Sequence, residues 1–222
     1  MKNHMRIQIA GVSSIEEALR LAALGVDGLG FTLRLPSGLH DGLTERAARD
    51  IIAQIPPLIG TVVITYVTAV RAALELCSYL GVNTLQLHAP VEAGVIRAIK
   101  HALPPLKVIK SVNVTGAQSI DDAVQAAHEA DALILDTYDP STGRHGATGK
   151  THDWRISREI VRRCPKPVML AGGLTPENVA RAIGSVRPWG VDVHTGIENA
   201  DGTRNWDKIT AFIAAARAGS AE

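Results

Sequence analysis

The feature that most constrains the fold of this chain is an alternation of short apolar segments with amphipathic segments, repeated eight times along 222 residues. Short apolar runs are typical of strands that are buried on both faces, as in a parallel sheet. The amphipathic segments carry helix caps at their starts and glycine or proline near their ends. The expected strands are residues 6–10, 26–33, 60–66, 83–87, 107–112, 132–135, 167–170 and 190–193.

Eight strand–helix units predict a parallel sheet with helices between the strands. Right-handed crossovers and eight repeats favour closure into a (β/α)8 TIM barrel over an open, doubly wound α/β sheet. We expect one domain over residues 1–222, with residues 1–5 as a short disordered leader. In such a barrel the functional site lies at the carboxyl ends of the strands.

Composition excludes several classes of partner. The chain has 23 Lys and Arg residues against 22 Asp and Glu residues, which argues against nucleic-acid binding. No apolar run reaches membrane-spanning length, and the N-terminus lacks the apolar core of a signal peptide. We therefore expect a cytoplasmic protein with no membrane partner. Cys77 and Cys164 have neither metal-ligand nor redox spacing and are expected to be small apolar residues.

A glycine turn follows the expected seventh strand. Gly172 and Gly173 allow a sharp turn and a close approach to a ligand, and Thr175 and Pro176 have the residue types of a helix N-cap and first helical position. Free backbone N–H groups at such a corner suit a phosphate. The alternative is a purely structural turn. Thr195-Gly196 forms a second turn after the last strand, and the two turns together predict a phosphate cradle.

Asp136 ends the apolar run of the sixth strand, so its carboxylate is expected at the rim of the barrel. A carboxylate there can be desolvated and can serve as a general acid or base. The alternative is an aspartate that caps the loop. His194 follows the eighth strand and could contact phosphate, transfer protons or bind a metal. Its alternative is a hydrogen bond within its own loop.

Further polar side chains end or follow other strands and are expected to bind substrate or to lie at the rim. Lys110 could form a Schiff base, or it could be a polar rim residue. The segment 146–150 lacks the glycine spacing of a nucleotide-binding loop and is expected to be a flexible lid. The remaining candidates at this end of the barrel are Gln8, Arg34, Gln86 and His88.

These residues, in this order, resemble the phosphoribosylanthranilate isomerase family, and the likeness covers most of the chain. The segments that carry it are Gly28-Leu29-Gly30-Phe31, Leu85-Gln86-Leu87-His88, residues 131–136, Thr148-Gly149-Lys150-Thr151 with Asp153-Trp154, residues 170–179, and Val191-Asp192-Val193 with Gly196-Ile197-Glu198. The resemblance implies a TIM barrel and an Amadori rearrangement of an N-phosphoribosyl aminobenzoate. It also implies that Asp136 is the general acid that opens the sugar ring.

The sequence departs from that family at the other two catalytic positions. The family's Lys-Ile-Cys-Gly, whose cysteine is the base, is replaced here by Gln8-Ile9-Ala10-Gly11. The family's arginine, which holds the substrate carboxylate after the second strand, is missing from residues 35–40; Arg34 is nearby but would need a shifted loop. The resemblance therefore implies a diverged member that retains the acid and the phosphate turns.

Histidine can supply a missing base near neutral pH, and His194 and His88 are the preferred replacements because strand ends are better fixed than loops. His40, His145 and His152 also fall in loops at this end of the chain's strands, where histidine could bind a metal, although no pair has metal-ligand spacing. We predict an isomerase of a phosphorylated small molecule, without cofactor or metal, as a monomer or homodimer. The alternatives are a lyase that uses Lys110 or a histidine-bound metal, and a non-catalytic barrel that binds a phosphorylated ligand.

Overall fold

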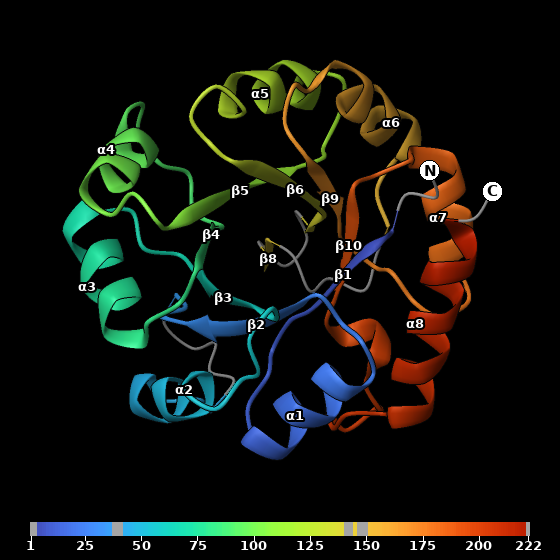
Figure 1. The fold of residues 1–222 in the computed structure, drawn as a ribbon. Coiled ribbons are helices and arrows are strands. Elements are labelled where there is room, and N and C mark those ends of the chain that lie inside the picture. The colour runs from blue at the N-terminus through green and yellow to red at the C-terminus, as the bar shows by residue number, and fades with distance from the viewer. Residues whose placement is uncertain (1–3, 37–41, 140–143, 146–150, 221–222) are drawn as a thin grey trace.

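Parallel strands close on one another to form the centre of the molecule. The computed structural model describes residues 4–36, 42–139, 144–145 and 151–220. Within them, eight parallel strands form a closed barrel in the order β1-β10-β9-β6-β5-β4-β3-β2 (Figure 1). These are β1 (Arg6–Ile9), β2 (Gly28–Leu33), β3 (Gly60–Thr65), β4 (Thr84–Leu87), β5 (Lys107–Asn113), β6 (Ala132–Asp136), β9 (Val168–Leu170) and β10 (Gly190–Val193). The predicted (β/α)8 barrel is confirmed.

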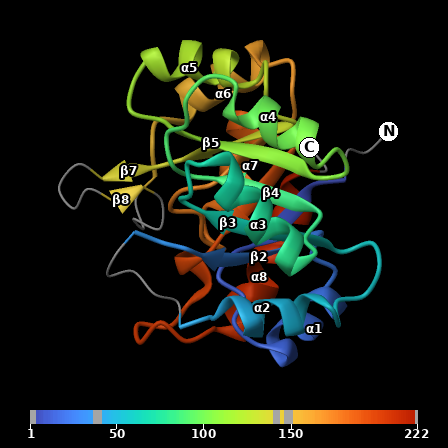
Figure 2. The same ribbon diagram turned by 90° about the vertical axis from the view of Figure 1, so that its left-hand side faces the viewer.

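The helices form a ring outside the barrel, as Figures 1 and 2 show from two directions. In the described part of the chain they are α1 (Ile15–Ala23), α2 (Glu45–Ile52), α3 (Val70–Leu80), α4 (Val95–Ala102), α5 (Gln118–Ala126), α6 (Trp154–Arg163), α7 (Val179–Val186) and α8 (Trp206–Gly219). None of these helices has both the length and the apolar character that a membrane span requires.

Local sequence explains where several helices begin and end. The hydroxyl of Ser14 accepts a hydrogen bond from the N–H of Glu17 at the start of α1. Thr44 does the same at the start of α2. Each such cap stabilises a helix by about 1 kcal/mol. Gly81 ends α3 in the left-handed region, at φ 72°, where a residue without Cβ is unstrained.

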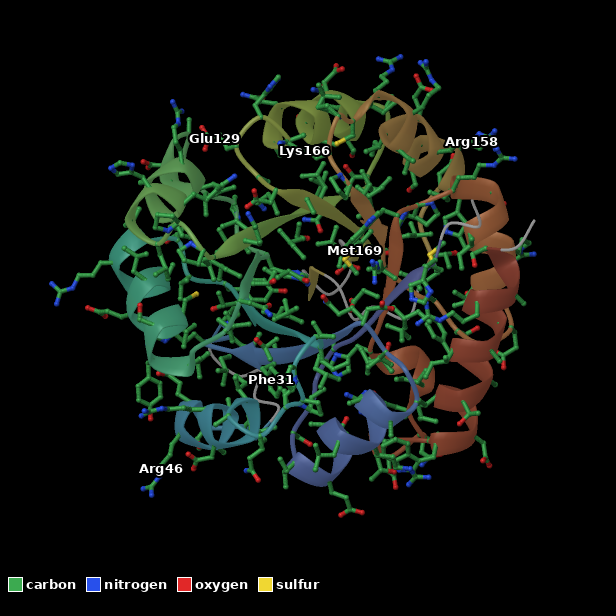
Figure 3. The ribbon with its side chains drawn as sticks, in the orientation of Figure 1. Phe31, Arg46, Glu129, Arg158, Lys166 and Met169 are labelled. Carbon is green, nitrogen blue, oxygen red and sulfur yellow. The ribbon has the colours of Figure 1, made fainter. Side chains whose placement is uncertain are left out.

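Alternation along each strand separates two apolar cores. Residues facing the helices, such as Phe31, belong to the large outer core, whereas Met169, Ile109 and Ile134 form a cluster inside the barrel. Figure 3 shows Met169 near the barrel axis and Phe31 on the outer side of β2. The same alternation decides which polar side chains near the carboxyl ends of the strands can reach a bound molecule.

Strands β1 and β10 are neighbours, which brings the two ends of the chain together. Gln8 pairs with Asp192 and Ile9 pairs with Val193 in the parallel register, and the N–H of Ala10 donates to the carbonyl of Val193. Because side chains alternate along a strand, Gln8 and Asp192 share the barrel's interior face, and Ala10 and His194 come next on that face.

Two local predictions were wrong. Helix α7 begins at Val179 with Asn178 as its N-cap, not at Pro176 after Thr175. The Oδ1 atom of Asn178 accepts from the N–H of Thr175, and its Nδ2 donates to the carbonyl of Gly173. These bonds hold residues 173–178 in a turn ahead of the helix, which is closed by a hydrogen bond from the N–H of Val179 to the carbonyl of Thr175. The interpretation of residues 1–5 as a leader also fails for Met5, which is buried, and for His4, which contacts Asp27; residues 1–3 lie outside the described residues.

The loop after β6 contains an unpredicted hairpin. Strands β7 (Tyr138–Asp139) and β8 (Arg144–His145) pair in antiparallel fashion, and the hairpin projects to one side of the barrel in Figure 2. A pairing of two residues on each side is too short to leave a periodic signal in the sequence. The segment 146–150 and His40 lie outside the described residues.

Candidate active site

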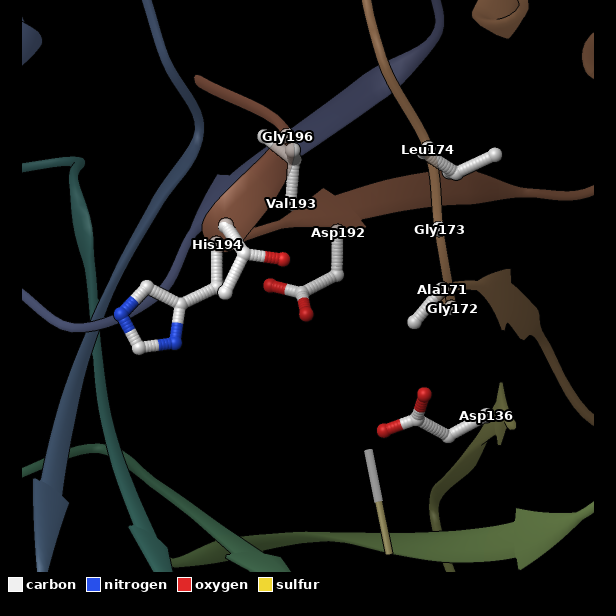
Figure 4. Close-up of a pocket in the computed structure, with 10 residues that line it drawn as sticks. Asp136, Ala171, Gly172, Gly173, Leu174, Asp192, Val193, His194 and Gly196 are labelled. Carbon is white, nitrogen blue, oxygen red and sulfur yellow. The ribbon is translucent and has the colours of Figure 1, made fainter. Parts of the chain in front are cut away.

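The two predicted glycine turns lie against each other. Gly172 and Gly173 adopt φ values of 78° and 63°, which strongly favour glycine. A Cβ placed on Gly196 would lie 1.9 Å from the carbonyl oxygen of Leu174, so the turn after β10 packs directly onto the turn after β9. Both turns line one pocket (Figure 4). The expectation that they lie close enough to serve one anion is consistent with this geometry.

Three glycines that line this pocket have backbone N–H groups without a partner among the described residues. Among the described residues, no hydrogen bond is donated by the N–H of Gly172, Gly173 or Gly196. Thr195 also lines the pocket and is exposed. Unpartnered N–H groups that converge from two turns suit the oxygens of a phosphate. The N-terminus of α7 is not part of this arrangement, because the helix starts six residues after Gly173.

Asp136 lies at the carboxyl end of β6 with its carboxylate in the same pocket. Its Oδ1 accepts a hydrogen bond of 2.7 Å from the N–H of Thr137. Burial disfavours the charged form and raises the pKa of Asp136 to about 6, although that hydrogen bond acts in the opposite direction. A carboxyl group with such a pKa can hold a proton near neutral pH and donate it to a substrate.

Asp192 is a second buried carboxylate in the pocket, and the sequence analysis did not select it as a site residue. It lies on β10 and faces the barrel interior, where its Oδ1 accepts from Nε2 of Gln8 at 2.9 Å. Burial and the neighbouring Asp136 raise its pKa to about 7. An aspartate within the apolar run of residues 190–193 was the available signal, because an acid in a buried strand needs a specific partner or function.

His194 follows β10, and its side chain lies against the end of the neighbouring strand β1. A Cβ on Gly11 would lie 2.3 Å from Nε2 of His194, so the imidazole packs directly against the backbone that follows Ala10. Ala10 is buried and faces the inside of the barrel with Val62 and Ile64. The histidine also lines the pocket that holds Asp136. The structure therefore places an imidazole beside a position that carries only a methyl group.

An ionic cluster holds this histidine. Nε2 of His194 lies 3.3 Å from Oε1 of Glu198, and the same Oε1 lies 3.3 Å from Nη1 of Arg204. Arg204 also contacts Oε1 of Glu17 at 2.6 Å and donates to the carbonyl of Ala10 at 2.5 Å. A carboxylate paired with one ring nitrogen fixes the orientation of an imidazole.

Gln8, Gln86 and His88 form a hydrogen-bonded chain across the barrel interior. Nε2 of Gln8 donates to Oε1 of Gln86 at 2.9 Å, and Nε2 of Gln86 lies 2.8 Å from Nε2 of His88. The His88 ring lies 5.5 Å from the ring of Tyr66, whose pKa is raised to about 12 by burial and by Asp136. His88 does not line the pocket of the glycine turns, so of the two predicted bases only His194 does.

Arg34 and Lys110 are not brought to this pocket. The guanidinium of Arg34 binds both carboxylate oxygens of Glu45, at 2.7 and 3.2 Å, and the carbonyl of Ala72. Lys110 shares the outer face of β5 with Val108 and Val112, and its Nζ donates to the carbonyl of Ser111 at 2.6 Å. Burial lowers its pKa to about 8, but strand alternation turns the amine away from the barrel interior, which argues against a Schiff base with a ligand there.

Among the predicted loop histidines, His152 connects two segments of the fold through its ring nitrogens. Its ring nitrogens contact the hydroxyls of Thr137 at 3.2 Å and Ser157 at 2.7 Å, which ties the segment after β6 to α6. Burial lowers its pKa to about 4, so the ring stays neutral. No group of three or more His, Cys, Asp or Glu residues that could hold a metal ion occurs in the described part of the chain.

Comparison with known proteins gives a consistent result. The family model described as N-(5'phosphoribosyl)anthranilate (PRA) isomerase matches residues 7–215. N-(5'-phosphoribosyl)anthranilate isomerase 2 of Methanosarcina mazei is 35% identical over 209 residues, covering 94% of this chain and 92% of that protein.

Solved structures agree with the sequence comparison. The crystal structure of phosphoribosyl anthranilate isomerase from Thermotoga maritima superposes with a TM-score of 0.85 at 31% identity, covering 96% of this chain and 99% of the other. A crystal structure of a phosphoribosyl anthranilate isomerase in complex with reduced 1-(o-carboxyphenylamino)-1-deoxyribulose 5-phosphate gives a TM-score of 0.82 at 29% identity, with coverage of 96% and 99%.

Proposed function

The chain belongs to the N-(5'-phosphoribosyl)anthranilate isomerase family, and we propose that it catalyses an Amadori-type isomerisation of a phosphorylated N-glycoside. N-(5'-phosphoribosyl)anthranilate is the substrate to test first. The two glycine turns bind the phosphate, Asp136 is the general acid, and His194 is the general base. Gln8 and Gln86 hold neighbouring side chains of the site in place and do not bind the substrate directly. Their amide groups are hydrogen-bonded to each other and to Asp192 and His88.

Phosphate binding has two lines of support. Gly172, Gly173 and Gly196 line one pocket, and their N–H groups donate no hydrogen bond within the part of the chain that the structure describes. The related crystal structure with a TM-score of 0.82 holds a ribulose 5-phosphate derivative. A phosphate held by fixed backbone donors would anchor the sugar with its reacting carbons toward the strand ends.

The chemistry requires one acid and one base. Asp136 gives its proton to the ring oxygen, and the bond from that oxygen to C1 breaks, which leaves a C1–nitrogen iminium. His194 then removes the proton from C2, and the C–H electron pair forms a C1–C2 double bond while the iminium electrons return to nitrogen. Loss of the enol proton and protonation of C1 complete the ketose. The sum of these proton transfers is zero, so no external reactant is consumed.

The position of His194 beside Ala10 is the observation that carries this proposal. The resemblance places the family's base at residue 10, where this chain has a methyl group, and His194 lies next to it on the neighbouring strand. The carboxylate of Glu198 pairs with Nε2 of the imidazole. The base has thus moved from β1 to the end of β10, on the same face of the barrel.

This relocation can be tested by moving the base back. We expect His194→Ala to lower kcat by about 10²–10⁴-fold, the usual contribution of a general base, and Asp136→Asn to do the same. The double variant His194→Ala with Ala10→Cys should recover part of the activity, because it restores a thiol at the family position. Isomerisation of N-(5'-phosphoribosyl)anthranilate is followed by the change in anthranilate fluorescence, and Ala10→Cys alone is the matched control.

Two results would contradict the proposal. If the wild-type protein neither converts this substrate nor supports growth of a tryptophan auxotroph that lacks the isomerase, the proposed reaction is wrong. If the wild type is active and His194→Ala retains its rate, the isomerase activity stands but His194 is not the base.

A further inference from the structure

Asp192 is a buried carboxylate that the acid and base above do not use. It lines the pocket together with Asp136 and His194, and Figure 4 shows its carboxylate between the imidazole of His194 and the carboxylate of Asp136. In the described part of the chain, the side chain of Asp192 accepts a hydrogen bond from the neutral amide of Gln8 alone. A buried carboxylate without a directly bound cation is costly in its charged form.

The groups around Asp192 come from several elements. Asp136 on β6 opposes its ionisation, whereas His194 and Arg204, which follow β10, favour it. Gln8 on β1 contributes a neutral donor. Neither Asp136 nor Asp192 forms an ion pair within the described residues. Two carboxylates that are both almost completely buried in one pocket repel each other when both are charged.

We propose that Asp136 and Asp192 form an electrostatically coupled carboxyl pair that together binds one proton near neutral pH, so that Asp192 keeps Asp136 available as an acid. This inference rests on the proposed function for its role in turnover, but the pair itself does not. Asp192 is a positioning residue in this scheme, because it acts through Asp136. Paired carboxyl groups of this kind lose their protons in two separated steps that belong to the pair.

Burial raises the pKa of Asp136 to about 6, and burial together with Asp136 raises the pKa of Asp192 to about 7, so both groups hold a proton more tightly than an exposed aspartate. An ordinary aspartate has a pKa near 3.9 and would be almost fully ionised at neutral pH. An unpaired, solvated Asp136 could therefore not donate a proton efficiently in the pH range of the cytoplasm.

The test compares single variants by two readouts. In the first, the infrared absorption of protonated carboxyl groups is titrated in the substrate-free protein. We expect the last proton to be lost in Asp192→Asn and in Asp136→Asn at a pH about one unit lower than in the wild type, the coupling at which two sites titrate together. Asp121→Asn removes an exposed carboxylate on α5 and should leave the titration unchanged.

The second readout is the pH dependence of kcat/KM. We expect Asp192→Asn to move the alkaline limb to lower pH by about the same interval, with little change in KM because the phosphate is held by the glycine turns. If the remaining carboxyl group titrates in each single variant as it does in the wild type, the pair is refuted. An inactive wild type with the expected infrared shift would refute the proposed function but support the pair.

Discussion

Gly196 is the residue on which the candidate phosphate site depends most directly. Because its Cβ position lies 1.9 Å from the Leu174 carbonyl oxygen, Gly196→Ala must push the two glycine turns apart. We expect a destabilisation of about 1–3 kcal/mol, as for other overpacked sites, and at least a tenfold weaker affinity for inorganic phosphate, equivalent to about 1.4 kcal/mol. Urea unfolding and calorimetric titration measure the two effects.

Gly184 provides a matched control for this substitution. It lies within α7, and a Cβ there would meet no atom within 4 Å. Gly184→Ala should stabilise the protein by up to about 1 kcal/mol through helix propensity and leave phosphate affinity unchanged. If Gly196→Ala and Gly184→Ala had the same effect on unfolding stability and on phosphate affinity, the contact between Gly196 and Leu174 would contribute to neither.

Residue types at the strand ends could be predicted from the sequence, but their directions could not. Asp136 and His194 were selected because they follow strands, and both line the pocket. Lys110 was selected by the same reasoning, yet its side chain lies on the outer face of β5. A shift of one residue along a strand moves a side chain to the opposite face. Arg34 has the required charge but is already bound to Glu45, and such a competing local partner leaves no pattern in the sequence.

Among the elements, the loop before α8 is attached to β1 and α1 mainly through Arg204. Its guanidinium contacts Glu17, Glu198 and the carbonyl of Ala10, and all three groups are at least partly buried. Arg204→Met should destabilise the protein by about 3–5 kcal/mol, because it leaves a buried carboxylate without its cation. Arg204→Lys should recover only part of this, because an ammonium cannot reproduce the planar fork.

Urea unfolding checks this expectation against an exposed ion pair. Arg155 binds Asp153 at the surface of α6, and such pairs contribute little to stability. Arg155→Met should therefore leave the unfolding midpoint nearly unchanged. A similarly small effect for Arg204→Met would mean that the ionic cluster around His194 contributes little to the free energy of unfolding.

Element boundaries followed from the sequence wherever a single residue decides them. Ser14 and Thr44 cap helices and Gly81 ends one, in line with the expected caps at helix starts and glycine near helix ends. The start of α7 was predicted wrongly. The side chain of Asn178 forms hydrogen bonds with the preceding turn, and such local side-chain bonds compete with the regular helix. The β7–β8 hairpin depends on pairing between segments whose alternation is too short to recognise.

At the scale of the whole molecule, the barrel was predictable because its signal is distributed over eight repeated units. Errors of one to four residues at single boundaries do not alter the number or order of strands. Closure then determines which strands become neighbours, and this is why β1 lies beside β10. The proximity of Ala10 and His194 is therefore a consequence of topology, and neither residue alone indicates it.

The pH dependence of global stability gives a last prediction. The pKa of Asp192 is raised from 3.8 to about 7 by folding, so the folded chain binds this proton more tightly than the unfolded chain. That contribution to stability is fully present below pH 4 and is lost as pH rises through 7. Asp192→Asn removes the ionisable group, so the variant should gain stability relative to wild type between pH 5 and pH 8, by an amount on the order of a few kcal/mol.

Urea unfolding of both proteins at several pH values measures this difference. The range below pH 5 is unsuitable, because Asp27 and Asp131 have lowered pKa values through their Arg and Lys partners and backbone N–H groups, and their stabilisation is lost as they become protonated. A stability difference that stays constant from pH 5 to pH 8 would mean that Asp192 ionises as easily in the folded chain as in the unfolded one, and that the site holds a single proton-carrying carboxyl group.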